Sequence, residues 1–231
     1  METTLLDKHK GPHPGVLAII FMVLFNTGLY QVISLSGTPP YYPGPWESPE
    51  VIVHYFQQHA QDVMWCAFFQ FGSAIPLGLL TAALYSRLRF LGINATGPSI
   101  ALFGGFMTAF NLVLSALLLW VMSYPGIAQD ESVARALYYM GFAIGGVGYS
   151  VPLGLLIAGV SVSAGLSCLL PKWFAAIGLA LALCGELSAF NLVFPKLLPL
   201  IPLTRFPGFI WLIAAGFMLP ATRRQGASSK S

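Results

Sequence analysis

One carboxylate stands deep within an apolar stretch of the sequence, Glu186 in the segment CGELSAFNLV. A charged side chain in the hydrocarbon region of a membrane is costly unless it is paired, protonated or hydrated. We therefore expect one of two roles for Glu186. It is either a functional group that faces a ligand, or a protonated carboxyl group that is hydrogen-bonded to a neighbouring helix and holds the helices together.

Arg205 is a second charged residue beside an apolar stretch, and it lies among Pro199, Pro202 and Pro207. We predict that it pairs with Glu186, because an arginine–carboxylate contact offsets part of the desolvation of both groups and is geometrically specific. The alternative is that Arg205 extends to the outer headgroups of the bilayer while Glu186 is protonated or faces a ligand.

Further polar residues gather in the outer halves or near the middle of the predicted membrane spans. This asymmetry predicts a polar cavity or a hydrogen-bonded cluster that opens outward. The alternative is a set of independent hydrogen bonds between helices, which contribute about 0.6 kcal/mol each on average. The candidate ligand-binding residues are Glu186, Arg205, Gln70, Asn111, Tyr149, Asn191 and Asn26.

The sequence carries no recognisable catalytic motif, so we name no catalytic residue and consider an intramembrane enzyme disfavoured. The histidines lie outside the predicted spans and the cysteines have no metal-like spacing, so we expect no metal site, no other cofactor and no disulfide. These residues are His9, His13, His54 and His59, and Cys66, Cys168 and Cys184.

The composition requires a membrane around these residues. Of the 231 residues, 56% are hydrophobic and only 8% are charged, whereas a soluble domain carries about 25% charged residues. The net charge of +3 is too small to suggest a nucleic-acid partner. Stretches long enough to cross a bilayer predict an all-α bundle of six transmembrane helices, at 16–36, 63–85, 98–123, 137–160, 173–194 and 207–222.

The last of these spans is short, and residues 196–206 before it are interrupted by proline. We expect this segment to be irregular backbone, either external or re-entrant into the membrane. In the external loop 37–62, Ser48 as N-cap and Pro49 as first helical residue predict a short surface helix over 49–60.

The distribution of Lys and Arg predicts that both termini, residues 1–15 and 223–231, are cytoplasmic. Eight Lys and Arg residues then lie inside and three outside. The inner set is Lys8, Lys10, Arg87, Arg89, Lys172, Arg223, Arg224 and Lys230, and the outer set is Arg135, Lys196 and Arg205.

The sequence also repeats itself. IPLGLLTA at 75–82 matches VPLGLLIA at 151–158, and AFNLV at 109–113 recurs at 189–193. We predict that spans two and three form a helical hairpin that is repeated in parallel by spans four and five. Phe106 stands where the second copy has Glu186, so the repeated architecture does not require that charge.

Several motifs resemble those of a family of uncharacterised bacterial multi-span inner-membrane proteins. They are FFQFGSAIPLGLL, SRLRFLG, ALFGGF, PLGLLIAGVS and LIPLTRFPGFIWLIAAGFMLP. The resemblance covers most of the chain after about residue 50. It implies a multi-pass protein of the bacterial inner membrane and implies no activity.

Two functions fit these observations. The first is binding or transport of a small or lipophilic molecule in an outward-facing cavity inside the membrane. The second is a non-catalytic accessory or structural role, in which the polar residues serve helix packing or a partner. The expected partners are membrane lipids, a small-molecule ligand, and a further copy of the chain or another membrane protein.

Overall fold

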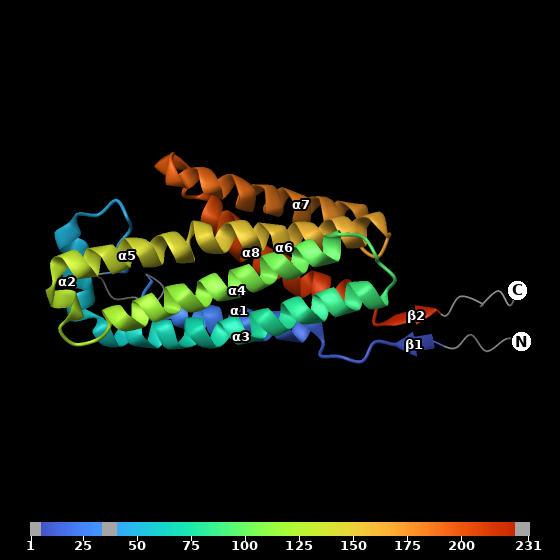
Figure 1. Cartoon of the computed structure of the whole chain (residues 1–231), viewed down its shortest axis with the longest axis horizontal. Helices are drawn as coiled ribbons and strands as arrows, with labels where there is room; N and C mark the ends of the chain where they lie inside the picture. The colour runs from blue at the N-terminus through green and yellow to red at the C-terminus, as the bar shows by residue number, and fades with distance from the viewer. Residues whose placement is uncertain (1–5, 34–40, 225–231) are drawn as a thin grey trace, which may run out of the picture.

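The computed structural model describes residues 6–33 and 41–224, and within them the chain is a helical bundle (Figure 1). The predictions for residues 1–5, 34–40 and 225–231, which include the end of the first span and the start of the external loop, lie outside the described residues. The α-helices are α1 (Pro14–Tyr30), α2 (Pro49–Gln58), α3 (Ala60–Phe90), α4 (Gly97–Met122), α5 (Glu131–Gly145), α6 (Val147–Leu166), α7 (Lys172–Leu187) and α8 (Leu200–Met218).

Short elements connect or close these helices. The 3₁₀ helices of the described residues are η2 (Ile127–Gln129), η3 (Ser188–Leu192) and η4 (Pro195–Leu197). Two strands near the termini, β1 (Leu6–Lys8) and β2 (Thr222–Arg224), pair antiparallel. The two ends of the described chain therefore lie at the same end of the bundle (Figure 1).

The chain is a polytopic membrane helix bundle, as the sequence predicts. Within the described residues, five helical segments are long and apolar enough to cross a membrane: Ala60–Phe90, Gly97–Met122, Glu131–Leu166, Lys172–Leu192 and Pro195–Met218. α1 is apolar but has only 17 residues, which corresponds to about 25 Å of rise. The count of six spans therefore stays a prediction.

Local sequence signals start the helices at the α2 end of the bundle. Ser48 Oγ accepts a hydrogen bond from the Val51 N–H, and Pro49 is the first residue of α2. Asp130 Oδ1 accepts from the N–H groups of Ser132 and Val133, at 3.0 and 3.1 Å, and caps α5. The predicted short helix after Ser48 is thus present as α2.

α6 is the central helix, because it packs against α4, α7 and α8 and also contacts α3 and α5. Its buried residues join side chains of α1 and α8 in the main core, where Phe21, Phe25 and Phe209 pack edge to face. A second core at the α2 end is formed by the side chains of Ile52, Phe56, Val63 and Tyr138, among others.

The last span begins earlier than the sequence predicts. Residues 200–206, expected to be irregular, form the first turns of α8. Pro199 is the N-cap, and Pro202 lies in the first turn, where a backbone N–H has no intrahelical partner to lose. Only Pro207 lies in the helix interior. For residues 200–206 the prediction of irregular backbone was wrong, because prolines that start a helix were taken as interrupting one.

The internal repeat stays a prediction, and one pair of equivalent contacts agrees with it. A Cβ added at Gly78 would lie 3.9 Å from the ring of Phe106, and one added at Gly154 would lie 3.2 Å from Glu186 Oε1. Gly154 and Glu186 are the residues that the repeat aligns with Gly78 and Phe106. However, Asn111 lies in α4 whereas its equivalent Asn191 lies in the 3₁₀ helix η3.

Candidate ligand-binding pocket

Arg205 lies inside the bundle, about five residues or 8 Å along α8 from its start. Its Nη2 donates a hydrogen bond to the carbonyl oxygen of Gly145. Its guanidinium carbon also lies over two aromatic rings, 4.7 Å from the centroid of Tyr149 and 5.4 Å from that of Phe25. A backbone carbonyl and two ring faces therefore surround the positive charge.

The carbonyl that Arg205 contacts is available because the helix is broken there. α5 ends at Gly145, and Gly146 has φ −89° and ψ −94° before α6 begins. A Cβ at Gly146 would lie 2.6 Å from the Phe142 carbonyl oxygen, so this backbone bend requires glycine. Carbonyl groups in the last turn of a helix lack intrahelical donors, and Arg205 supplies one to Gly145.

A second carbonyl near this break also receives a side-chain donor. Pro152 has no N–H, so the carbonyl of Gly148, four residues earlier, loses its helical partner. Asn111 Nδ2 from α4 donates to that oxygen. The neutral Asn111 thus does at Gly148 what the charged Arg205 does at Gly145.

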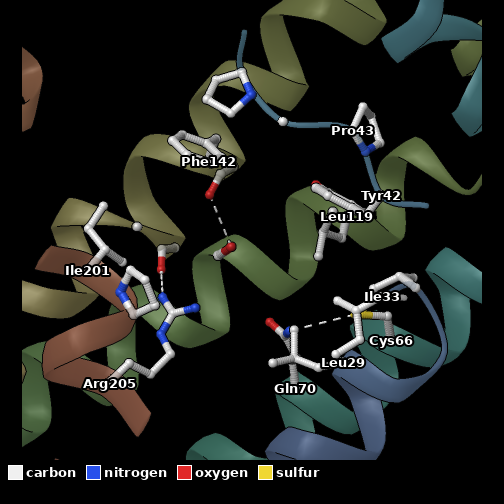
Figure 2. A pocket seen from close by; sticks show the side chains of 18 of the residues that line it. Leu29, Ile33, Tyr42, Pro43, Cys66, Gln70, Leu119, Phe142, Ile201 and Arg205 are labelled. Atoms are coloured by element: carbon white, nitrogen blue, oxygen red, sulfur yellow. Dashed lines mark hydrogen bonds between the residues drawn. The ribbon is translucent and has the colours of Figure 1, made fainter. Parts of the chain in front are cut away.

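A pocket of 510 Å³ lies next to Arg205 at the α2 end of the bundle (Figure 2). Its walls come from α1, α3, α4, α5, α8 and the loop after residue 41, and they are mostly apolar. Among the described lining residues, Arg205 is the only one with a charged side chain. Side chains that define its walls are Phe25, Leu29, Cys66, Gln70, Leu112, Ser115, Leu119, Phe142, Leu198 and Ile201.

The polar side chains of the pocket differ in how well they are satisfied. Ser115 Oγ already donates to the Gly141 carbonyl at 3.1 Å. Gln70 Nε2 makes only a weak contact of 3.6 Å with the sulfur of Cys66. Arg205 Nε is buried without a hydrogen-bond partner among the described residues. Arg205 and Gln70 reach the pocket from different helices, α8 and α3 (Figure 2), and both have unused hydrogen-bonding capacity.

The loop 42–46 lines one end of this pocket. Tyr42 N–H donates to the Val32 carbonyl at 2.9 Å, and Tyr138 Oη donates to the Pro43 carbonyl at 2.7 Å. The ring of Tyr42 packs against Tyr55, Phe56 and Tyr138. Burial among these rings raises the pKa of Tyr42 well above its usual range, so its phenol is neutral and adds no charge to the pocket.

The predicted pair between Glu186 and Arg205 is absent. The one ion pair within the described residues joins His59 and Asp62. Glu186 Oε1 is instead buried near Gly154 of α6 without a hydrogen-bond partner, while Arg205 turns to the break between α5 and α6. The prediction failed because an ion pair requires the faces of α7 and α8 that carry the two residues to meet. Arg205 instead finds an acceptor in the Gly145 carbonyl.

The structure brings together only some of the seven candidate residues. Arg205 and Gln70 line the pocket, and the ring of Tyr149 packs against the guanidinium of Arg205. Asn111 holds the helix break, whereas Asn26 only donates to the Met22 carbonyl of its own helix. Glu186 and Asn191 are not among the residues that line the pocket.

Sequence reasoning missed most of the apolar wall of the pocket and the loop 42–46 that lines one end of it. The proline-rich and aromatic stretch YYPGPW was interpreted only as an external loop, and Gly145 only as part of a G-x-x-x-G packing motif with Gly141. A run of glycines that ends in a proline, GGVGYSVP, is the signal that could have indicated the broken helix.

No family model, no curated protein and no solved structure matches this chain. The resemblance to a bacterial inner-membrane family therefore stays a prediction, and any function must be argued from the pocket itself.

Proposed function

We propose that this chain is a multi-pass protein of the bacterial inner membrane that binds or transports a small lipophilic molecule. The observation that carries the proposal is the 510 Å³ pocket lined mainly by apolar side chains. Ligand sites in proteins are typically concave, mostly apolar, and about 300–1,000 Å³ in volume, with a few polar groups that fix the orientation of the ligand. Arg205 and Gln70 are such groups here.

The arrangement of charges supports a pocket on the outer side. Lys and Arg are concentrated at the end of the bundle that holds β1 and β2, where Arg87, Arg89 and Lys172 lie at helix ends. By the positive-inside rule, this distribution supports a cytoplasmic position for that end. The pocket lies at the opposite end of the bundle, which supports a pocket that opens outward.

Photolabelling of the purified protein in lipid nanodiscs tests this function. A fatty acid and a long-chain alcohol, each carrying a photoactivatable group on the alkyl chain, are the probes, and mass spectrometry locates the labelled residues. We expect labels on residues that line the pocket, such as Phe142 and Leu119. Leu29→Trp, which fills the pocket from α1, should reduce this labelling.

Val23→Trp is the matched control, because Val23 lies on the same helix but is 53% exposed on its outer face. It should leave pocket labelling unchanged. Labels from both probes confined to the outer, lipid-facing surface would contradict the proposal and would favour the alternative, an accessory or structural subunit whose polar residues serve packing.

A further inference from the structure

We propose that the pocket selects a lipophilic anion, a molecule with one apolar chain and an oxyanion such as a carboxylate or phosphate, and that Arg205 is the residue that binds the oxyanion. This inference rests on the proposed binding function and names the class of its ligand. It follows from the surroundings of Arg205, from the neighbouring Asn111, and from the character of the pocket wall.

The first step is that Arg205 has no opposite charge to balance it within residues 6–33 and 41–224. No carboxylate among the described residues forms an ion pair with it, and its one hydrogen bond is to the Gly145 carbonyl. A guanidinium carries more N–H donors than this bond uses, and no atom of the described residues is hydrogen-bonded to the buried Nε. Buried charges in proteins are normally paired, so an anion is the ligand that Arg205 suits.

The second step is that the structure does not need a cation at this position. The carbonyl of Gly148, freed in the same region of the chain, is satisfied by the neutral amide of Asn111. An amide would serve Gly145 equally well, without the desolvation that a guanidinium carries. The positive charge therefore has a use other than capping α5.

The third step is the shape and polarity of the space that Arg205 faces. Apolar side chains such as Leu29, Leu112 and Ile201 line the pocket, which suits an alkyl chain or a ring system. Arginine recognises carboxylate and phosphate oxygens through paired N–H donors. Gln70, also on the wall, can donate or accept one further hydrogen bond. One charged end and one apolar body describe a single-chain amphiphilic anion.

A competition experiment tests the inference with the full-length protein in nanodiscs of zwitterionic lipid, at a pH that ionises the carboxylate. The probe is the photoactivatable fatty acid, and the competitors are a fatty acid, an alkyl phosphate and an alcohol of equal chain length. We expect at least one of the two anions to compete about tenfold or more better than the alcohol, because hydrogen bonds to charged groups are that strong. Arg205→Gln should abolish this preference and Arg205→Lys should keep part of it.

Arg135→Gln is the control, because Arg135 is an exposed cation on α5 at the same end of the bundle, and the preference should persist in it. Displacement of the probe by an anionic lysophospholipid added to the nanodisc would assign the oxyanion to a single-chain membrane lipid rather than to a free amphiphile. Equal competition by alcohol and anions in the wild-type protein would overturn the inference and leave the proposed function standing. If neither photoactivatable probe labelled the pocket, both the inference and the proposed function would be overturned.

Discussion

Glu186 and Arg205 show how individual charged side chains are accommodated within the bundle. Arg205 is surrounded by the rings of Tyr149 and Phe25 and by the Gly145 carbonyl, which together replace part of its hydration. Glu186 Oε1 is buried near the backbone of Gly154, and no hydrogen-bond partner for it lies in the described part of the chain. Each side chain therefore has separate surroundings, and neither charge neutralises the other.

Glu186→Gln should change the free energy of unfolding by less than about 1 kcal/mol, because the substitution removes a poorly solvated carboxylate and breaks no ion pair. Combined with Arg205→Gln, the two effects should add, since residues without a shared contact do not couple. Thermal or denaturant unfolding of the purified single and double variants measures this. A coupling energy above about 1 kcal/mol would mean that the two side chains do meet.

Asn111 and Asn191 form a matched pair for comparison, because the predicted internal repeat aligns them while their hydrogen bonds differ. Asn111→Ala should destabilise the protein by about 1–3 kcal/mol, since the Gly148 carbonyl loses its donor. Asn191 lies in η3 with no hydrogen bond from its side chain within the described structure, so Asn191→Ala should have little effect. Equal losses in the two unfolding experiments would contradict this difference.

Sequence alone could identify which residues are unusual at this scale, but not what they contact. Arg205 and Gln70 were singled out because polar groups in apolar segments are rare, and both line the pocket. Whether Arg205 would meet Glu186 or Gly145 depends on how far α7 and α8 are rotated about their axes. That rotation is set by packing on α6, which no local sequence pattern reports.

At the scale of elements, small residues decide how closely α4 and α6 approach. A Cβ at Gly104 would lie 2.6 Å from both the Leu156 nitrogen and the Pro152 oxygen, which are backbone atoms that cannot move aside cheaply. Gly104→Ala should therefore cost about 1–3 kcal/mol of stability through overpacking. The midpoint of thermal unfolding in detergent measures the loss.

Gly72→Ala is the control for this substitution. Gly72 lies within α3, and a Cβ there would meet nothing within 4 Å. Alanine should leave stability unchanged or raise it by about 0.5–1 kcal/mol, because glycine is the poorer helix former. A drop in both variants would show that glycine is needed for a reason other than the contact between α4 and α6.

The helices themselves were largely predictable, whereas their ends and the break between α5 and α6 were not. Apolar length placed α3, α4 and α7, because a membrane span has to be long and apolar. The span predicted at 137–160 instead covers the end of α5 and the first part of α6. The start of α8 was misplaced because proline both starts and interrupts helices, and only the register of hydrogen bonds distinguishes the two. The bend at Gly146 depends on Arg205 and Asn111, which come from distant parts of the sequence.

At the scale of the whole molecule, the pairing of β1 with β2 joins the two ends of the chain. His9 N–H donates to the Ala221 carbonyl at 2.9 Å, and its ring nitrogen Nε2 is hydrogen-bonded to Ser86 Oγ at 3.0 Å. Burial lowers the pKa of His9 below its usual value of about 6.5, and the charge of Arg87 lowers it further. The folded state therefore favours the neutral ring.

This preference makes the pairing of β1 with β2 sensitive to acid. The contribution of His9 to the stability of this pairing is fully present above the ordinary histidine pKa of about 6.5. It declines as the pH falls from there toward the lowered pKa of the folded state. We expect amide hydrogen exchange in Leu6–Lys8 to quicken relative to the intrinsic rate over that range. His9→Phe, which cannot be protonated, should remove the pH dependence, and its persistence in that variant would place the sensitive group elsewhere.

The arrangement of the whole chain across the membrane gives the last prediction. The described ends of the chain and the loop between α6 and α7 lie at one end of the bundle, and Ser48 lies at the other (Figure 1). Cys168, in that loop, is exposed, whereas Cys66 is buried.

Because the end with Cys168 carries most of the Lys and Arg residues, we expect it to face the cytoplasm. In sealed right-side-out vesicles, a membrane-impermeant maleimide should then leave Cys168 unlabelled until the membrane is permeabilised. In the Cys168→Ser background, Ser48→Cys should be labelled at once in the same vesicles. Labelling in the reverse order would mean that the orientation is inverted. Labelling of both positions from one side would mean that the chain crosses the membrane an even number of times between them, which contradicts the predicted topology.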